Sequence, residues 1–349
     1  MLSDSPTIKN ITIKNRFAVP PMVCFHRADA DGYVSEFNVE HYRELARGGF
    51  GLIIVEATAI TLRSRLHETE LGLWEDGQID GMRRIVDAIH AEGAKAFIQL
   101  VHAGGNGIDT TPDAPSAMTY RENNAVEMTQ EAIDDVIEKF AAAAVRAKAA
   151  GFDGLELHGC HGYLLSEFFS TIYNVRTDAY GEDHALITKQ VFKAVRKACG
   201  DDFIVGIRLA AFEPTLEDGL RNAKAIADLT DFLDISYGMD SDAHPPVDFP
   251  CSPAVYGAMM IKRELPDMPV FAVHNINSRE DAENALATGI DMVDIGKAAL
   301  VDPAFAAHAL ADEPCGVCLH CKNRCRWDPP VMADMSAVCP GKLLFEKDR

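Results

Sequence analysis

The stretch Gly154-Leu-Glu-Leu-His158-Gly-Cys-His161-Gly-Tyr163-Leu-Leu-Ser-Glu-Phe168 places two histidines and a tyrosine directly after a short apolar run. The run predicts a β-strand that ends at His158. A lone histidine there is most simply a loop residue held by local hydrogen bonds. Two imidazoles and a phenol together can bind an oxygen and move a proton, which indicates an active site. Active sites of (β/α)8 barrels lie at the carboxyl ends of the strands, so the stretch suggests that fold.

Short apolar or β-branched runs recur along the chain and alternate with helical segments, which favours a parallel α/β barrel, the (β/α)8 or TIM barrel. The predicted strands are Phe17–Pro20, Gly51–Glu56, Ala96–Leu100, Gly154–His158, Phe203–Leu209, Phe232–Ser236, Val270–Val273 and Met292–Ile295. The predicted helices are Asn38–Arg47, Ile79–Glu92, Gln130–Ala150, His184–Ala198, Leu220–Thr230, Ala254–Glu264 and Arg279–Ala287. The alternative is an open doubly wound sheet, which would need a glycine-rich fingerprint after its first strand, where this chain has Pro20-Pro21-Met22.

The composition is that of a globular protein, with 349 residues of which 48% are hydrophobic and 25% charged. No linker or repeat divides residues 1–310, so we expect one barrel domain there and a separate cysteine-rich extension over residues 311–349. The net charge of −20 argues against a nucleic-acid partner. The chain shows neither an apolar run of about 18 residues nor a secretion signal, so we expect a cytoplasmic protein without a membrane span.

Polar or small residues follow several predicted strands and would meet at one mouth of the barrel. They include Gln99 after the third strand, Arg208 at the end of the fifth, Asn275 after the seventh, and Gly296 and Lys297 after the eighth. Buried polar groups of this kind require a polar ligand. The loops after strands seven and eight commonly hold a phosphate in such barrels, which would here meet Asn275, the Gly296 N–H and Lys297.

Nine cysteines are present, and five of them crowd into the extension. Four of the five follow the spacing Cys318-x2-Cys321-x3-Cys325-x13-Cys339, and Cys315 is an additional thiol. Without a secretion signal, such a cluster indicates a metal site rather than disulfides. Four thiolates at this spacing can hold a [4Fe-4S] cluster. Zinc is the alternative, because spacing alone does not choose the metal, and an empty redox-sensitive cluster is a third reading.

Several motifs, taken together and in order over residues 5–310, resemble the old yellow enzyme family. The motifs are Lys14-Asn15-Arg16-Phe17 before Pro21-Met22, Val55-Glu56-Ala57-Thr58, Ile98-Gln99-Leu100-Val101-His102-Ala103-Gly104, His158-x-x-His161-Gly162-Tyr163-Leu164, Asn174-x-Arg176-Thr177-Asp178-x-Tyr180-Gly181 and Ile295-Gly296-Lys297. Members of that family are FMN-dependent (β/α)8 barrels, and many reduce activated C=C bonds. The resemblance implies an enzyme with FMN as cofactor and NAD(P)H as the reductant.

The resemblance also implies a role for each matching residue. His158 and His161 would bind the electron-withdrawing oxygen of an α,β-unsaturated substrate, and Tyr163 would give the proton. The flavin would contact the residues Pro21, Met22, Ala57, Gln99, Arg208, Asn275, Gly296 and Lys297. Gln99 would lie at the pyrimidine edge of the ring, and Arg208 would stabilise negative charge on the reduced ring.

The chain departs from the family pattern at three places. Lys297 stands where an arginine usually binds the phosphate, and His274-Asn275 stands where a glycine is common. A cysteine that tunes or attaches the flavin in some relatives would align with Val23, whereas Cys24 lies one residue later. Since neighbouring residues of a strand face opposite sides, we do not assign Cys24 to the flavin and expect a buried thiol.

The tail is similar to the [4Fe-4S] site, with ligands Cys318, Cys321, Cys325 and Cys339, of larger relatives such as dienoyl-CoA reductase, enoate reductase and trimethylamine dehydrogenase. Those relatives continue into a nucleotide-binding region, and we expect this chain to work without the electron route that such a region provides. Either NAD(P)H reduces the flavin directly, or an electron-donor protein works through the cluster. The rival functions are amine dehydrogenation of the trimethylamine dehydrogenase type and an electron-transfer subunit. Short members of the family are often homo-oligomers, which we also expect here.

Overall fold

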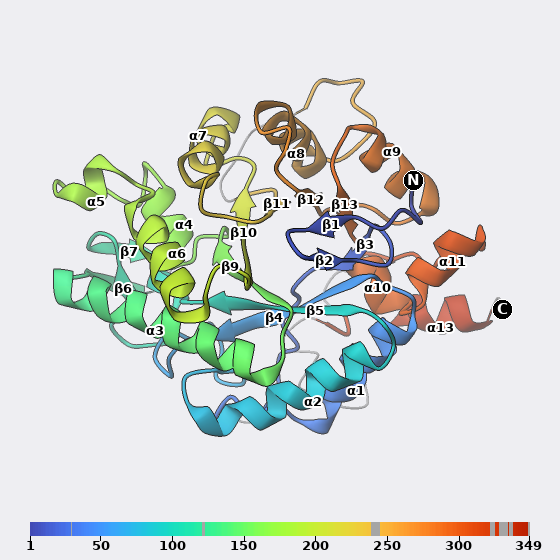
Figure 1. The fold of residues 1–349 in the computed structure, drawn as a ribbon, viewed down its shortest axis with the longest axis horizontal. Coiled ribbons are helices and arrows are strands. Elements are labelled where there is room, and N and C mark those ends of the chain that lie inside the picture. The colour runs from blue at the N-terminus through green and yellow to red at the C-terminus, as the bar shows by residue number, and fades with distance from the viewer. Residues whose placement is uncertain are drawn as a thin grey trace.

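The computed structural model describes residues 1–28, 30–120, 123–238, 245–321, 325–327, 334 and 338–347. Eight strands close into a barrel in which every neighbouring pair runs parallel (Figure 1). In barrel order they are β3 (Phe17–Val19), β4 (Leu52–Ala59), β5 (Lys95–Val101), β9 (Gly154–Gly159), β10 (Ile204–Ala210), β11 (Leu233–Ser236), β12 (Val270–Ala272) and β13 (Met292–Asp294). The predicted TIM barrel is confirmed, and each barrel strand overlaps a predicted one.

Helices connect successive strands and surround the barrel (Figure 1). The long ones are α1 (Glu36–Arg47), α2 (Ile79–His90), α3 (Gln130–Ala150), α6 (Leu186–Cys199), α7 (Leu216–Ile226), α8 (Pro253–Glu264) and α9 (Arg279–Ala287). The short ones are η1 (Asp76–Gln78), η2 (Gly104–Asn106), α4 (Leu164–Phe169), α5 (Ala179–Glu182), α10 (Lys297–Val301), α11 (Phe305–Ala311) and α13 (Pro340–Lys347). No helix in the described ranges is long and apolar enough to cross a bilayer.

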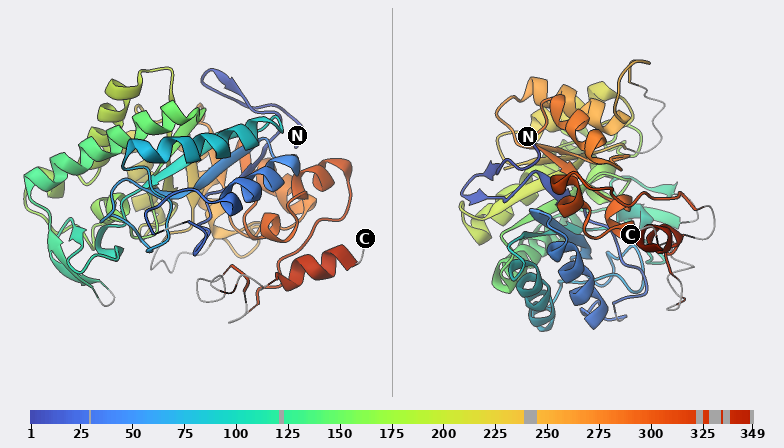
Figure 2. Two further views of the ribbon diagram at one scale, coloured as in Figure 1. Left: turned by 90° about the horizontal axis from the view of Figure 1, so that it is seen from below. Right: turned by 90° about the vertical axis from the view of Figure 1, so that its right-hand side faces the viewer.

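Two small sheets outside the barrel were not predicted. A hairpin of β1 (Thr7–Ile8) and β2 (Ile11–Thr12) lies on one side of the barrel, and α13 lies on the opposite side (Figure 2). The second sheet contains β6 (Asp113–Ala114), β7 (Met118–Tyr120) and β8 (Asn123–Glu127). Their strands are too short to show a period-two apolar pattern, which is why the sequence did not reveal them.

The interior of the barrel has an apolar layer and, one step along the strands, a polar layer. Phe232 packs between Phe97 and Phe271, with ring centroids 5.5 Å and 5.0 Å away. Because alternate residues of a strand share a face, the positions two residues further on also point inward. These positions carry polar side chains, which form the floor of the mouth and are Gln99, Glu156, Arg208, Asp234 and Asp294.

The extension returns to the barrel after α11. The Gly316 N–H donates to Asp302 Oδ2 at 3.0 Å, and Lys342 of α13 forms an ion pair with Glu44 of α1 at 2.9 Å. These contacts hold the extension against the barrel and α1. The division of the chain near residue 310 stays a prediction.

Candidate active site

The predicted cluster at the end of β9 is held in one hydrogen-bonded line. His158 Nε2 lies 3.2 Å from His161 Nδ1, and His161 Nε2 lies 2.8 Å from Ser236 Oγ on β11. The backbone turns sharply here, because His161 and Gly162 have φ angles of 64° and 70°. The turn brings Tyr163 to the start of α4, where its ring packs edge-on against His158 at 4.7 Å.

Both imidazoles are held neutral. Burial lowers the pKa of His158 well below its usual value, and the positive charges of His161 and Arg208 act in the same direction. Burial, followed by the charge of Arg208, lowers the pKa of His161 to about 3. A neutral imidazole has one N–H donor and one acceptor, and His161 uses both of its nitrogens, one toward His158 and one toward Ser236. His158 Nδ1 has no partner among the described residues, which leaves it available to a ligand.

Arg208 is the cation of the polar layer, and three carboxyl groups surround it. Its Nη1 lies 3.3 Å from Asp234 Oδ2, and both side chains are buried. Burial by itself lowers the pKa of the guanidinium, but Asp234 and the other acidic groups outweigh it and raise the pKa. Burial and the neighbouring Asp234 raise the pKa of Glu156 and of Asp294. The layer therefore combines one fixed positive charge with carboxyls that resist ionisation.

Gln99 is oriented by this layer. Its Nε2 donates to Glu156 Oε1 at 2.7 Å, so its carbonyl oxygen is turned away from Glu156. Gln99 is buried, and a buried amide oxygen needs a donor. The amide is thus set to accept a hydrogen bond from an N–H of a bound ring.

A cavity of about 230 Å³ lies at the carboxyl ends of β3, β10, β11, β12 and β13. The predicted flavin ligands that line it are Pro21, Met22, Arg208, Asn275, Gly296 and Lys297. The Nε of Arg208 has no partner in the described part of the chain, as expected of a donor that awaits a ligand. The cavity thus offers the guanidinium of Arg208, the ammonium group of Lys297 and the backbone of Gly296, which fit a flavin and its phosphate.

The structure does not bring every predicted residue into that cavity. Ala57 is buried on β4, and Gln99, His158, His161 and Tyr163 also lie outside the lining. Two contacts connect them to it. Ser236 lines the cavity and bonds His161, and Glu156 lies between Gln99 and the charge of Arg208.

The unusual residues after β12 and β13 meet at one end of the cavity. His274 and Asn275 both have positive φ angles, 92° and 57°, and this conformation explains why a glycine is common there. Burial, then the nearby Lys297, lowers the pKa of His274. No carboxyl group is among the causes of the pKa shift of His274. The cation of Lys297 near this imidazole therefore suits a bound phosphate group.

The four predicted metal ligands of the tail line a second cavity, of about 430 Å³. Cys318, Cys321, Cys325 and Cys339 all line it, and the cysteines in the described ranges form no disulfide with one another. Met22 and Lys297 line this cavity and the flavin cavity alike, so the two sites adjoin. Cys315 is not among the lining residues; its Sγ lies 3.8 Å from the carbonyl of Phe305.

Sequence reasoning missed several residues that shape the site. The inward-facing positions of the predicted strands carry Glu156, Asp234, Ser236 and Asp294. The alternation of inward and outward residues along each strand could have identified them. Glu56 was also missed as a structural acid. Burial raises its pKa to about 7, although the Cys24 N–H donates to it at 2.6 Å. Cys24 is buried as expected.

The family is decided by comparison with known proteins. The model of the NADH:flavin oxidoreductase / NADH oxidase family matches residues 5–313. The NADPH dehydrogenase of Listeria innocua is 38% identical over 315 residues, which are 86% of this chain and 92% of that protein. The chain belongs to the old yellow enzyme family. It is therefore a flavin-dependent oxidoreductase, as the sequence motifs predicted.

Solved structures support the same conclusion. A 2-naphthoyl-CoA reductase, in complex with 2-naphthoyl-CoA, is 26% identical, with a TM-score of 0.84 over 95% of this chain and 57% of that one. The histamine dehydrogenase from Rhizobium sp. 4-9 is also 26% identical, with a TM-score of 0.80 over 95% of this chain and 52% of that one. The present chain therefore spans little more than half the length of either of these two proteins.

Proposed function

We propose that this enzyme reduces the C=C bond of an α,β-unsaturated carbonyl compound, such as an enone, an enoate or an enoyl thioester. The observation that carries the proposal is the line from Ser236 through His161 to His158, beside Tyr163. A neutral imidazole with one ring nitrogen left for a ligand, beside a phenol, suits a carbonyl oxygen, on which negative charge grows as the bond is reduced.

The histidine pair would bind that oxygen and polarise the double bond, with the unpartnered Nδ1 of His158 toward the oxygen and His161 orienting the His158 ring. Because burial keeps both imidazoles neutral, the pair can donate a hydrogen bond without a net charge of its own. The hydrogen bond to Ser236 holds His161 in place. Such fixed donors stabilise developing charge without reorganising during the reaction.

Tyr163 would supply the proton to the α-carbon. A phenol has an ordinary pKa near 10, so it keeps its proton at neutral pH and can serve as a general acid. The ring lies at the amino end of α4 and packs against His158, which holds the phenol on the substrate side of the histidines. Hydride exchange between a nicotinamide, the ring and the substrate is the chemistry that bound FMN would supply.

The polar layer would hold the flavin. Arg208 offers an unpartnered Nε to the ring, and its fixed charge favours the reduced, anionic ring. Gln99 presents its amide oxygen because Glu156 occupies its nitrogen. Lys297, the Gly296 backbone, Asn275 and His274 would hold the phosphate end.

The tail would hold a [4Fe-4S] cluster. Its four cysteines line one cavity, which shares Met22 and Lys297 with the flavin cavity. This adjacency supports electron exchange between the two sites. Electrons would come from NAD(P)H or from a donor protein. Histamine dehydrogenase is named for an amine substrate, but removal of hydride from an amine needs no proton donor such as Tyr163, so we rank amine oxidation second.

Tyr163→Phe tests the proposal. In anaerobic stopped-flow measurements, NAD(P)H or dithionite should bleach the flavin of the variant as fast as that of the parent. Reoxidation by a panel of cyclohexenone, cinnamate and crotonyl-CoA should be on the order of 10²- to 10⁴-fold slower, which is the usual contribution of a general acid. Tyr256→Phe, on α8 and remote from the histidines, is the matched control and should behave as the parent.

Two results would contradict the proposal. Reoxidation of the Tyr163 variant at the parent rate would exclude the phenol as the acid. Failure of the parent to react with every unsaturated compound, combined with flavin reduction by an amine, would move the function to amine dehydrogenation.

A further inference from the structure

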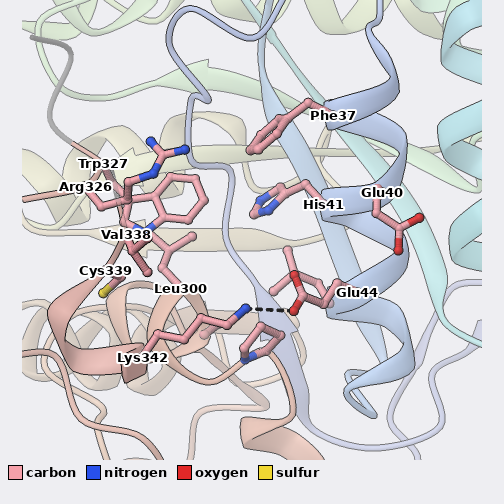
Figure 3. Close-up of a pocket in the computed structure, with 13 residues that line it drawn as sticks. Phe37, Glu40, His41, Glu44, Leu300, Arg326, Trp327, Val338, Cys339 and Lys342 are labelled. Carbon is pink, nitrogen blue, oxygen red and sulfur yellow. Dashed lines mark hydrogen bonds and ion pairs between the residues drawn. The ribbon is translucent and has the colours of Figure 1, made fainter. Parts of the chain in front are cut away.

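A third cavity, of about 230 Å³, lies between the tail and α1, away from the flavin ligands (Figure 3). Aromatic side chains line it. Phe37 and His41 of α1 stack nearly parallel, with an interplanar angle of 8° and centroids 5.8 Å apart. The Trp327 ring of the tail packs directly against that of His41, with centroids 5.4 Å apart. A flat apolar group could lie against this aromatic surface.

Two polar donors at this cavity lack acceptors. Arg326 Nη1 and Trp327 Nε1 are buried and have no hydrogen-bond partner within the ranges that the structure describes. The guanidinium of Arg326 lies over the Trp327 ring, 5.4 Å from its centroid, so the two side chains that carry these donors pack against each other. A buried donor without an acceptor costs about 1–3 kcal/mol, and a ligand that supplies an acceptor recovers that cost.

The charges around the cavity leave an excess of positive charge. Its carboxylates, Glu40 and Glu44, are each paired, with Arg43 and Lys342 respectively. Arg27 lies over the outer part of the wall, 4.8 Å from the Phe37 ring. Burial, followed by the like charge of Arg326, lowers the pKa of Arg27. Two neighbouring cations are stabilised by an anion between them.

We propose that this cavity binds a small aromatic carboxylate, with its ring against the aromatic surface of Phe37, His41 and Trp327 and its carboxylate on Arg326 and Trp327 Nε1. The size is suitable, because a cavity of about 150 Å³ already holds benzene. The binding site is separate from the flavin site and does not depend on the proposed reaction. It adjoins the cysteine cavity, since Cys339, Leu300, Arg326 and Trp327 line both. A ligand bound here would therefore touch the residues that surround the metal.

The two tryptophans of the chain make the test specific. Protein labelled with 5-fluorotryptophan should show two ¹⁹F resonances, which Trp74→Phe and Trp327→Phe assign. Titration with benzoate should shift the Trp327 resonance in a saturable way and leave that of Trp74 unchanged. The neutral isostere benzamide should bind more weakly. The flavin spectrum reports separately on any benzoate that enters the flavin site.

Variants of Arg326 decide the outcome. Arg326→Gln should raise the Kd for benzoate by about ten- to a hundredfold, as expected for a lost charge-assisted hydrogen bond, and Arg326→Lys should keep part of the affinity. Glu40→Gln, on the same cavity, is the matched control and should not weaken binding. The proposal is overturned if benzoate does not shift Trp327 at millimolar concentration, or if Arg326→Gln binds it as well as the parent. Neither result depends on catalysis.

Discussion

At the scale of single residues, the site depends on side chains that point into the barrel. His158, His161, Tyr163 and Arg208 could be found from sequence, because they stand at the ends of recognisable strands. Their partners could not. Ser236 bonds His161 across 75 positions of the chain, and only the closed barrel brings β11 next to that turn. Long-range pairs of this kind are set by topology, which a local pattern does not contain.

The carboxyls around Arg208 should differ in their effect on stability. Asp234→Asn leaves the buried guanidinium without its closest anion, and we expect a loss of about 3–5 kcal/mol in the free energy of unfolding. Asp294→Asn should cost no more than about 1 kcal/mol, because burial and Asp234 already favour its protonated form, which asparagine resembles. Urea unfolding at pH 7 measures both. Equal losses would show that Asp294 is ionised.

The buried histidines should make the protein sensitive to acid. Burial and Arg208 lower the pKa of His161 to about 3 from its ordinary 6.5, so the unfolded chain takes up this proton at a higher pH than the folded chain. The contribution to stability is complete above pH 6.5 and is lost as the pH falls toward 3. The free energy of unfolding should therefore decrease from pH 6.5 to pH 4, and less steeply in His161→Gln. Parallel curves would mean that His161 does not titrate in this range.

At the scale of elements, the sequence predicted which segments are helices better than where they start. α7 begins at Leu216 rather than at the predicted Leu220, because Thr215 and Asp218 form a capping box. The Asp218 N–H donates to Thr215 Oγ1 at 3.1 Å, and the Thr215 N–H donates to the Asp218 carboxylate at 3.1 Å. This capping box is visible in the sequence, but it lies ahead of the apolar positions that suggested the helix. α3 was predicted with its observed bounds, since glycine follows it directly.

Gly151 ends α3 and directs the backbone toward β9. Gly151 has a φ of 100°, in the left-handed region, and an added Cβ would meet only Val86, at an ordinary 3.5 Å. The cost of Gly151→Ala is thus a backbone cost, and we expect a loss of about 1–2 kcal/mol in unfolding free energy. Gly151→Asn should cost less, because asparagine tolerates this conformation better. Thermal or urea unfolding checks the order, and a neutral alanine variant would contradict the assigned strain.

At the scale of the whole molecule, the barrel and its tail form neighbouring cavities with shared walls. The barrel was predictable because each strand and helix carries its own signal in sequence. The position of the tail was not, because it depends on contacts such as Lys342 with Glu44, which are 298 residues apart. That return of the chain puts the cysteine cavity beside Met22 and Lys297, at the mouth where the flavin ligands meet.

Removal of the proposed cluster should therefore act first on the tail. In anaerobically purified protein, Cys321→Ser should lose iron and acid-labile sulfide and the brown absorption shoulder, since a cubane needs all four thiolates. Without the proposed cluster, the tail would lose the ligand that its cysteines share, and the tail should become more sensitive to limited proteolysis while the barrel keeps its circular dichroism.

The matched control is Cys251→Ser, whose thiol lies outside the cysteine cavity and which should retain the parent iron content. Zinc in the parent, removed by a chelator without loss of colour, would replace the cluster with a structural ion. Parent iron and sulfide content in Cys321→Ser would exclude that thiol as a ligand and make Cys315 the candidate to replace it. A tail that is equally protected with and without metal would mean that contacts such as the Gly316 N–H to Asp302 and Lys342 to Glu44 hold it on their own.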